Sequence, residues 1–382
     1  MASTPPPFRT PPPSPPALME ELIEEILLRL PPEEPVYLIR AALVCKAWRR
    51  ILSDSSRGGF LRRYREFHGA PPLLGYVHNA HHHPRLDSTT TTASPPLSMP
   101  EASDEDMRWV LDCRHGRVLI MDDIYSPSIR FIIWDPITRD RKHVKVPDYY
   151  PYSSHAAAVL CAMDGCDHLH CNGGPFHVVL VEKRDVSGEE HVAWARIYSS
   201  ETDAWSAASA SIVVCFPINS LRSLLVRGAL YFTFSDWGTT PSIIMYDLSS
   251  NGLSMIDASG VPIGAIAMKA HDGSLGFVAT DTEFEWNCRY LILMSQQAAG
   301  GWARHKTVEL EPTLLAKKPR ELFGYADGTD TVFISTDAGV FTLHLKSRLV
   351  KKVAERYDCY RVLPYTSFFT PELAKARRLR QR

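Results

Sequence analysis

Apolar residues recur at three- and four-residue spacing from position 18 to position 30, in the segment LMEELIEEILLRL. Glutamates and an arginine fill the positions between them, so the pattern predicts an amphipathic helix with a broad apolar face. Pro31 and Pro32 end this helix, because proline cannot donate the backbone hydrogen bond that a continuing helix requires.

Two further helices are predicted before position 70. The segment 38–52, LIRAALVCKAWRRIL, places apolar side chains on one side and Lys46, Arg49 and Arg50 on the other. A third, short helix is predicted over residues 60–67. Three helices of this size enclose too small a core to be stable alone, so we expect a partner or a second domain to cover part of their surface.

From Arg108 onward the pattern changes to short β-prone runs separated by Gly, Asp, Asn and Ser. The runs include RVLIM, IRFIIW, HVVLVEK, ALYFTF, SIIMYDL, YLILM, TVFIS and VFTLHL. Many short strands with turn residues between them are typical of a β-sandwich, a barrel or a propeller.

A loose internal repeat favours the propeller. Similar strand ends recur at Trp134, Tyr198, Tyr246, Trp302 and His344, with gaps of 64, 48, 56 and 42 residues. A unit of about 50 residues fits a four-stranded, kelch-like blade, and the length of this region allows about six blades. The predicted fold class is therefore a multidomain α plus all-β chain, with small helices followed by a β-propeller over residues 108–370.

Three segments lie outside these patterns. Residues 1–17 hold eight prolines and are predicted to be a disordered tail. Residues 69–107 are rich in Ser, Thr and Pro and read as a linker or as an irregular first part of the propeller. Residues 371–382 form a basic tail, either a solvated terminus or a nuclear localisation signal.

Charge and composition narrow the class of function. Lys plus Arg total 42 against 43 for Asp plus Glu, and this balance argues against a dedicated nucleic-acid-binding protein. No apolar run reaches about 18 residues, so no membrane span is predicted. The N-terminus lacks the apolar core of a secretory signal, so we expect the eight cysteines to be reduced thiols in the cytoplasm or nucleus.

One segment, CAMDGCDHLHCNGGPFH, is rich in possible metal ligands. It contains Cys161, Cys166, Cys171, His168, His170 and His177. Thiolate and imidazole suit zinc, but the cysteines follow one another at two equal steps, without the closely paired ligands of zinc ribbons and fingers. The sequence interpretation is a loop between two blade strands, with no metal or cofactor assigned.

Sequence signatures of catalysis are missing from the chain. It has no GxSxG elbow, no P-loop, no HExxH helix and no GxGxxG fingerprint. We therefore predict a non-catalytic protein, and the alternative that remains open is a sugar-active or metal-dependent propeller enzyme. Aromatic residues between the predicted strands are better candidates for recognition of a target protein, although they could equally cap blade cores. These residues are Tyr149, Tyr150, Tyr152, Trp237 and Trp286.

The helical region resembles the F-box. The resemblance rests on LxxEILLRLPP, which ends at Pro32, followed by VCKxW from Val44 to Trp48. It implies docking onto the Skp-type adaptor of SCF ubiquitin ligases, and through it to the cullin and RING subunits. By resemblance the residues at or near that interface are Leu18, Leu22, Ile26, Leu30, Pro31, Val44, Cys45 and Leu52. Trp48 is expected in the core instead.

The rest of the chain is similar to the F-box-associated, kelch-like propeller domains that are abundant in plants. The motifs are DCRHGRVL at 112–119, WDPIT at 134–138 and RGALY at 227–231. Their structural interpretation puts Gly116 in a hairpin turn, Trp134 in a blade core and Pro136 at a strand exit.

Together the two resemblances imply a substrate receptor of a ubiquitin ligase, in which residues 18–68 dock the adaptor and the propeller binds a target for degradation. An F-box scaffold that does not support ubiquitylation is the alternative within the same resemblance.

Overall fold

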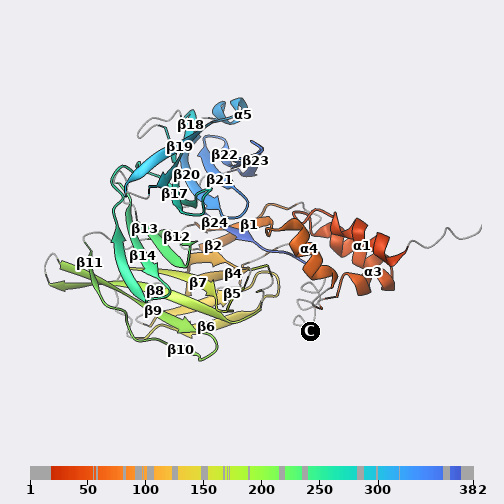
Figure 1. The fold of residues 1–382 in the computed structure, drawn as a ribbon, viewed down its shortest axis with the longest axis horizontal. Helices are drawn as coiled ribbons and strands as arrows, with labels where there is room; N and C mark the ends of the chain where they lie inside the picture. The colour runs from red at the N-terminus through yellow and green to blue at the C-terminus, as the bar shows by residue number, and fades with distance from the viewer. Residues whose placement is uncertain are drawn as a thin grey trace, which may run out of the picture.

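The computed structural model describes a helical domain joined to a ring of β-sheets (Figure 1). The described residues are 19–54, 56, 59–80, 83–90, 97, 99–100, 107–122, 128–147, 154–166, 168–169, 171, 173–187, 190–214, 220–234, 240–281, 288–297, 300–317, 319–355 and 362–370. The predicted tails at 1–17 and 371–382 lie outside them. Among the described helices, none is both long and apolar enough to cross a membrane.

Four helices form the domain that the sequence predicted as three. They are α1 (Glu20–Leu28), α2 (Val36–Val44), α3 (Lys46–Ile51) and α4 (Phe60–His68). The predicted helix 38–52 is divided at Cys45, whose backbone is extended and whose Sγ accepts a hydrogen bond from the Trp48 amide at 3.5 Å. Cys45 therefore acts as the N-cap of α3, because its sulfur takes one of the amide groups that a helix start leaves unpaired.

The helical core is closed by α4. Leu27, Leu38, Leu52, Phe60 and Tyr64 are among its buried side chains. The Tyr64 hydroxyl donates to the Leu30 carbonyl at 2.8 Å, and the ring of His68 bonds to the Leu28 carbonyl at 2.9 Å. The bond at Leu28 satisfies a carbonyl in the last turn of α1, which a helix terminus leaves without an intrahelical partner, and the bond at Leu30 holds the chain just beyond the helix.

In the described part of the chain the remaining elements are twenty-four strands and one short helix, α5 (Pro312–Leu315). The first twelve strands are β1 (Leu73–Ala80), β2 (His83–Ser88), β3 (Trp109–Arg114), β4 (Arg117–Asp122), β5 (Arg130–Trp134), β6 (Arg141–Lys145), β7 (Ser154–Cys161), β8 (Phe176–Ser187), β9 (Glu190–Ser199), β10 (Ala204–Trp205), β11 (Ile212–Val214) and β12 (Ser220–Val226). The others are β13 (Ala229–Phe234), β14 (Ser242–Asp247), β15 (Gly252–Ile256), β16 (Ile266–Lys269), β17 (Leu275–Thr280), β18 (Tyr290–Gln296), β19 (Trp302–Glu309), β20 (Pro319–Ala326), β21 (Thr331–Thr336), β22 (Gly339–His344), β23 (Val350–Ala354) and β24 (Val362–Thr366).

These strands form a closed six-bladed propeller, as the repeat predicted. Within the described residues the blades are β3–β6, β7–β11, β12–β15, β16–β19, β20–β23 and the sheet β2-β1-β24. The innermost strands contact one another in a ring, β3 with β7, β12 with β16, β16 with β20, β20 with β24 and β24 with β3, and β12 also contacts β7. The last blade pairs the two ends of the domain, because β1 lies between β2 and the C-terminal β24. The segment 69–107, predicted as linker or propeller, thus supplies two strands of the closing blade.

Three of the five repeat positions are buried aromatic residues at the ends of strands, whereas Trp302 begins β19 and His344 ends β22, and both are half-buried. Trp134, Tyr198 and Tyr246 end or nearly end the third strand of the first three blades, and all three are buried. The Tyr198 hydroxyl donates to Asp203 and the Tyr246 hydroxyl donates to Asn251, five residues further along in each case. The turns that follow β9 and β14 are therefore fixed to the blade core by Tyr198 and Tyr246.

Gly116, Trp134 and Pro136 lie where the sequence motifs predicted them: in a hairpin turn, in a blade core and at a strand exit. His115 and Gly116 form the turn between β3 and β4 with positive φ angles of 52° and 72°, as a two-residue hairpin turn requires. Trp134 is 1% exposed. Pro136 follows the end of β5, where the carboxylate of Asp135 accepts a hydrogen bond from the Ile137 amide at 2.8 Å.

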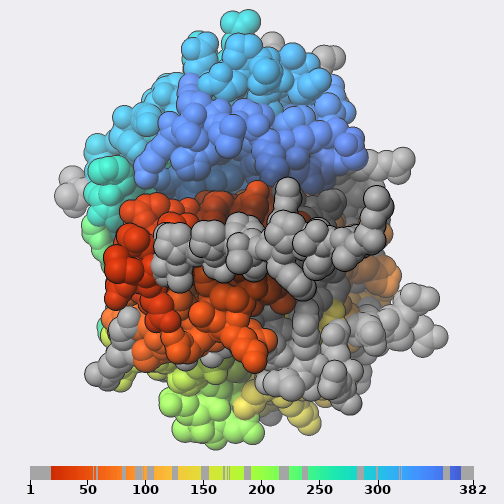
Figure 2. All heavy atoms as spheres, turned by 90° about the vertical axis from the view of Figure 1, so that its right-hand side faces the viewer, coloured from red at the N-terminus to blue at the C-terminus, as the bar shows by residue number. Residues whose placement is uncertain are grey.

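The helical domain covers one face of the propeller. In an antiparallel blade, the first-to-second and third-to-fourth hairpins share one end, and the connections to the next blade share the other. The chain enters β1 from α4 at the end where β24 finishes, which is the end of the first-to-second hairpins. Figure 2 looks onto this face and shows the helices in front of the strands.

Gly339 at the start of β22 is expected to be intolerant of any side chain. Its φ is +118°, and a Cβ atom there would lie 2.1 Å from the carbonyl oxygen of Ala354. We expect Gly339→Ala to cost about 3 kcal/mol or more, from backbone strain and the clash together. Gly260→Ala is the matched control, because Gly260 also has a positive φ but has nothing within 4 Å, and strain alone costs about 1–2 kcal/mol. Urea unfolding of the three proteins measures the difference, and equal midpoints for the two variants would contradict it.

Candidate functional site

The first helix carries an apolar stripe on its solvent side. Met19, Leu22 and Ile26 are 64%, 47% and 55% exposed, while Ile23 and Leu27 on the opposite side are buried. Spacings of three, four and seven residues place the exposed three along one face of the helix. Contact between these apolar side chains and water is unfavourable. A partner that covers the stripe would therefore bind with a favourable change in free energy.

A second exposed apolar group lies where α2 meets α3. Leu43 is 70% exposed and Val44 is 62% exposed, and Cys45 beside them is exposed as well. We use the name helical apolar surface for all the large exposed apolar side chains of this domain. They are Met19, Leu22, Ile26, Tyr37, Leu43, Val44 and Phe67.

The helical domain is unusually rich in such side chains. Among the described residues, twelve large apolar side chains are exposed, and seven of them belong to the helical apolar surface. The five others are spread over a propeller several times its size. Scattered exposed residues are ordinary, but a concentration of this kind marks an interaction site.

The predicted adaptor-contact residues divide into three groups. Leu22, Ile26, Pro31, Val44 and Cys45 are exposed, and Leu30 is half-buried against the helical core. Leu18 lies outside the described residues. The prediction that Leu52 contacts the adaptor is corrected. Its side chain has no exposed surface and packs inside the helical core, so it cannot reach a partner.

The sequence interpretation did not include Met19, Tyr37 and Leu43. The signal for Met19 was present, since it stands three and seven residues before Leu22 and Ile26 on the same helix. Leu43 could not be assigned from spacing, because the break at Cys45 changes the direction of the chain beside it. Trp48 is half-buried against the core, in keeping with its predicted place.

Exposed and half-buried ion pairs join α1 to its neighbours. Arg63 of α4 pairs with Glu24 and Glu25, and Arg50 of α3 pairs with Glu20 at 2.5 Å. Such surface pairs contribute only about 0–1 kcal/mol each. They link α1 to α3 and α4, and the apolar stripe of α1 stays uncovered.

Three apolar side chains fix the helical domain to the propeller. Phe368, which follows β24, is 3% exposed and lies in the helical core, with its ring 6.2 Å from that of Tyr64 in an edge-on arrangement. Leu169, from the connection between β7 and β8, packs against the same core. Ile39 of α2 packs in the other direction, against the core that includes Trp134 and Leu363. The junction is thus packed from both sides.

The predicted target-binding residues Tyr149, Tyr150, Tyr152, Trp237 and Trp286 all lie outside the described residues. The strand ends that flank them, among them Lys145, Phe234 and Thr280, lie at the propeller end opposite the helices. Their role as contacts stays a prediction.

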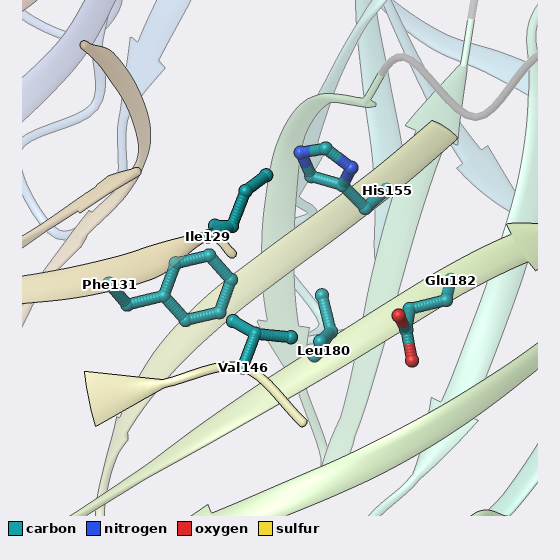
Figure 3. Close-up of a pocket in the computed structure, with 6 residues that line it drawn as sticks. All are labelled: Ile129, Phe131, Val146, His155, Leu180 and Glu182. Carbon is teal, nitrogen blue, oxygen red and sulfur yellow. The ribbon is translucent and has the colours of Figure 1, made fainter. Parts of the chain in front are cut away.

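A narrow hollow lies between the first and second blades near that end (Figure 3). Its walls are Ile129, Phe131, Val146, His155, Leu180 and Glu182. The carboxylate of Glu182 accepts a hydrogen bond from the indole nitrogen of Trp194 at 3.1 Å, and the ring of His155 contacts the sulfur of Met121. The hollow has no space that a water molecule could occupy, so it offers no substrate site in this form.

The cysteines of the ligand-rich segment come together in the structure. The ligand atoms of Cys161, Cys166, His168 and Cys171 all lie within 4.8 Å of one another. His170 lies outside the described residues, and His177 stands on β8 apart from this group. Burial raises the pKa of the Cys171 thiol.

Comparison with known proteins agrees with this architecture. The F-box domain family matches residues 18–58. The family described as "F-box protein AT5G49610-like, beta-propeller" matches residues 109–373. A search of curated proteins finds no match.

Solved structures resemble the chain in fold only. TolB from Acinetobacter baumannii has 12% identity and a TM-score of 0.41, with 78% of this chain and 68% of TolB covered. A fucose-specific lectin from Aleuria aurantia has 12% identity and a TM-score of 0.38, with 67% of this chain and 81% of the lectin covered. Identities and scores this low carry no argument about ligands. The helical domain, the six blades and the two family matches together show that this chain belongs to the F-box proteins of the AT5G49610-like β-propeller family.

Proposed function

We propose that this protein is the substrate receptor of an SCF-type ubiquitin ligase, with the F-box docking a Skp-type adaptor and the propeller binding the target protein. The observation that carries the proposal is the helical apolar surface, which stays exposed although the helical core beneath it is closed by α4, Phe368 and Leu169. The family match supports the adaptor as its partner. Leu22, Ile26, Val44 and Cys45 are the proposed central contacts.

The arrangement of the two domains suits such a receptor. The F-box covers one propeller face (Figure 2), and in this proposal the target binds at the opposite face or the rim. The packed junction through Phe368, Leu169 and Ile39 fixes the spacing between adaptor and target. A fixed spacing accelerates ubiquitin transfer, because it turns an encounter between target and charged enzyme into an effectively intramolecular step.

In this role no residue of the chain performs chemistry. The adaptor brings the cullin and RING subunits, and the charged enzyme that they recruit supplies the reactive thioester. A cytoplasmic or nuclear location follows from the same proposal, since the ligase works there. The scaffold alternative differs at one point only: the complex would assemble, but no bound protein would become ubiquitylated.

Reconstitution tests the proposal and separates it from the scaffold alternative. The full-length chain is combined with adaptor, cullin, RING subunit, ubiquitin and its enzymes, together with proteins that copurify with the tagged chain. We expect ubiquitin chains on at least one copurified protein, dependent on the receptor. Assembly of the complex without any modified partner would favour the scaffold, and failure to bind adaptor would overturn the proposal.

A further inference from the structure

The connection between β7 and β8 gathers three thiols and one imidazole at a single point. Cys161 is the last residue of β7, and Cys166, His168 and Cys171 follow within the connection. Cys171 is buried, Cys161 and Cys166 are half-buried and His168 is exposed, so the group is open to solvent on one side only. Nothing in the F-box role uses these side chains.

The backbone of this connection is folded around the sulfur atoms. The Met163 amide donates to Cys161 Sγ and the His168 amide donates to Cys166 Sγ, both at 3.4 Å. Gly165 and His168 take positive φ angles of 62° and 61°, which turn the chain back on itself at each step. These two amide contacts and the two turns fold the connection around its sulfur atoms.

The separations match what a tetrahedral metal needs. With a zinc–sulfur bond of about 2.3 Å, the sulfur ligands of a tetrahedral site lie about 3.8 Å apart. The four ligand atoms already lie within 4.8 Å of one another, so each pair has to close by only about 1 Å or less. We propose that Cys161, Cys166, His168 and Cys171 bind a structural zinc ion.

The ligand set and its charge favour zinc over other metals. Three thiolates and one neutral imidazole are a common set for structural zinc, whereas magnesium and calcium prefer oxygen ligands. Binding releases one proton from each thiol to solvent and leaves the site with one net negative charge. The buried guanidinium of Arg117 lies against the site, where it donates to the Cys171 carbonyl at 3.3 Å and offsets that charge.

Neighbouring residues hold the ligands in place. The ring of His115 packs against that of His168 with centroids 4.2 Å apart, which limits the orientations of the ligand ring. Arg117 also donates to the Gly174 carbonyl and lies over the ring of Phe176, at 5.4 Å from its centroid. The guanidinium thereby joins the end of the connection to β4, as outer residues do around metal ligands.

The proposed site also bears on the junction between the two domains. Leu169 lies between His168 and Cys171 in sequence and packs against the F-box core. A metal ion bound by His168 and Cys171, which flank Leu169 in the sequence, would hold Leu169 in this contact. We therefore assign the zinc a structural role, in which it orders the segment that supports the F-box on the propeller.

Metal analysis of the full-length chain tests the site. After purification under reducing conditions from zinc-supplemented medium, we expect about one zinc per chain by mass spectrometry. Cys166→Ser and His168→Ala are expected to lower the content at least about fivefold, because each removes one of four ligands. His177→Ala removes a histidine of the same segment that lies outside the group, so this control variant should keep the zinc.

A second measurement uses the wild-type chain, so it tests the site even if the variants fail to fold. Cobalt is added to the metal-free wild-type chain, and the visible absorption of tetrahedral cobalt with thiolate ligands is recorded. Such a spectrum supports the site, and its loss on addition of zinc supports it further. Wild-type protein that holds no zinc and gives no such spectrum would overturn the proposal, as would zinc retained in full by Cys166→Ser. Adaptor capture by the same preparations is a separate readout, so failure of the zinc site is distinguishable from failure of the F-box role.

Discussion

Replacement of Leu22 and Ile26 by glutamate is expected to weaken adaptor binding at least about hundredfold, because two central apolar contacts typically contribute about 2 kcal/mol or more each and the new charges would be buried. Both side chains are about half exposed in the free protein, so the fold does not depend on them. We therefore expect the double variant to unfold within about 1 kcal/mol of the wild type.

The measurement is adaptor affinity by calorimetry on the full-length chain, beside its urea unfolding curve. Met255→Glu with Val213→Glu is the matched control, since both residues are exposed and apolar but lie on the propeller. The control should bind the adaptor as the wild type does. A double variant of Leu22 and Ile26 that is folded and binds normally would show that this stripe is not the docking surface.

Replacement of Phe368 by alanine is expected to loosen the F-box from the propeller. A buried phenylalanine truncated to alanine costs about 3–5 kcal/mol, from lost apolar burial and the cavity that remains. Phe368 is unusual because it comes from the far end of the chain and packs among F-box residues such as Tyr64. The loss should therefore fall on the helical domain and its junction, while the outer blades stay intact.

Hydrogen exchange tests this prediction, because it reports the stability of each region of the chain separately. We expect amide exchange in α4 to rise about a hundredfold, as a loss of 3 kcal/mol implies, with exchange in β16–β19 unchanged. Phe67→Ala is the control, because Phe67 lies on the same helix but is 58% exposed. Equal exchange in α4 for the two variants would contradict a supporting role for Phe368.

Much of the fold is determined locally and could be predicted from the sequence. The amphipathic spacing from 18 to 30 and the prolines after it predicted α1, because helix periodicity and termination depend on neighbouring residues. The β-prone runs predicted strands such as β13 and β21, and the repeat near 50 residues predicted six blades. Hairpin turns such as that at Gly116 were also predictable, since positive φ favours glycine.

Tertiary structure alone decided which of the apolar positions are exposed. The same F-box pattern contains Leu22 and Leu52, yet one is exposed and the other has no exposed surface, because burial depends on which helix packs where. The pattern also did not show that Phe368 and Leu169 complete the F-box core from distant positions.

The cysteine cluster shows the same division between sequence and fold. The sequence determined the presence of three thiols and a histidine in one short connection, but their equal steps do not match the spacing of zinc ribbons and fingers. Only the fold of the connection between β7 and β8 brings the four ligand atoms within 4.8 Å. Metal binding depends on the distances between ligand atoms in space. Sequence spacing limits which of these atoms can approach one another, but the turns at Gly165 and His168 bring them together.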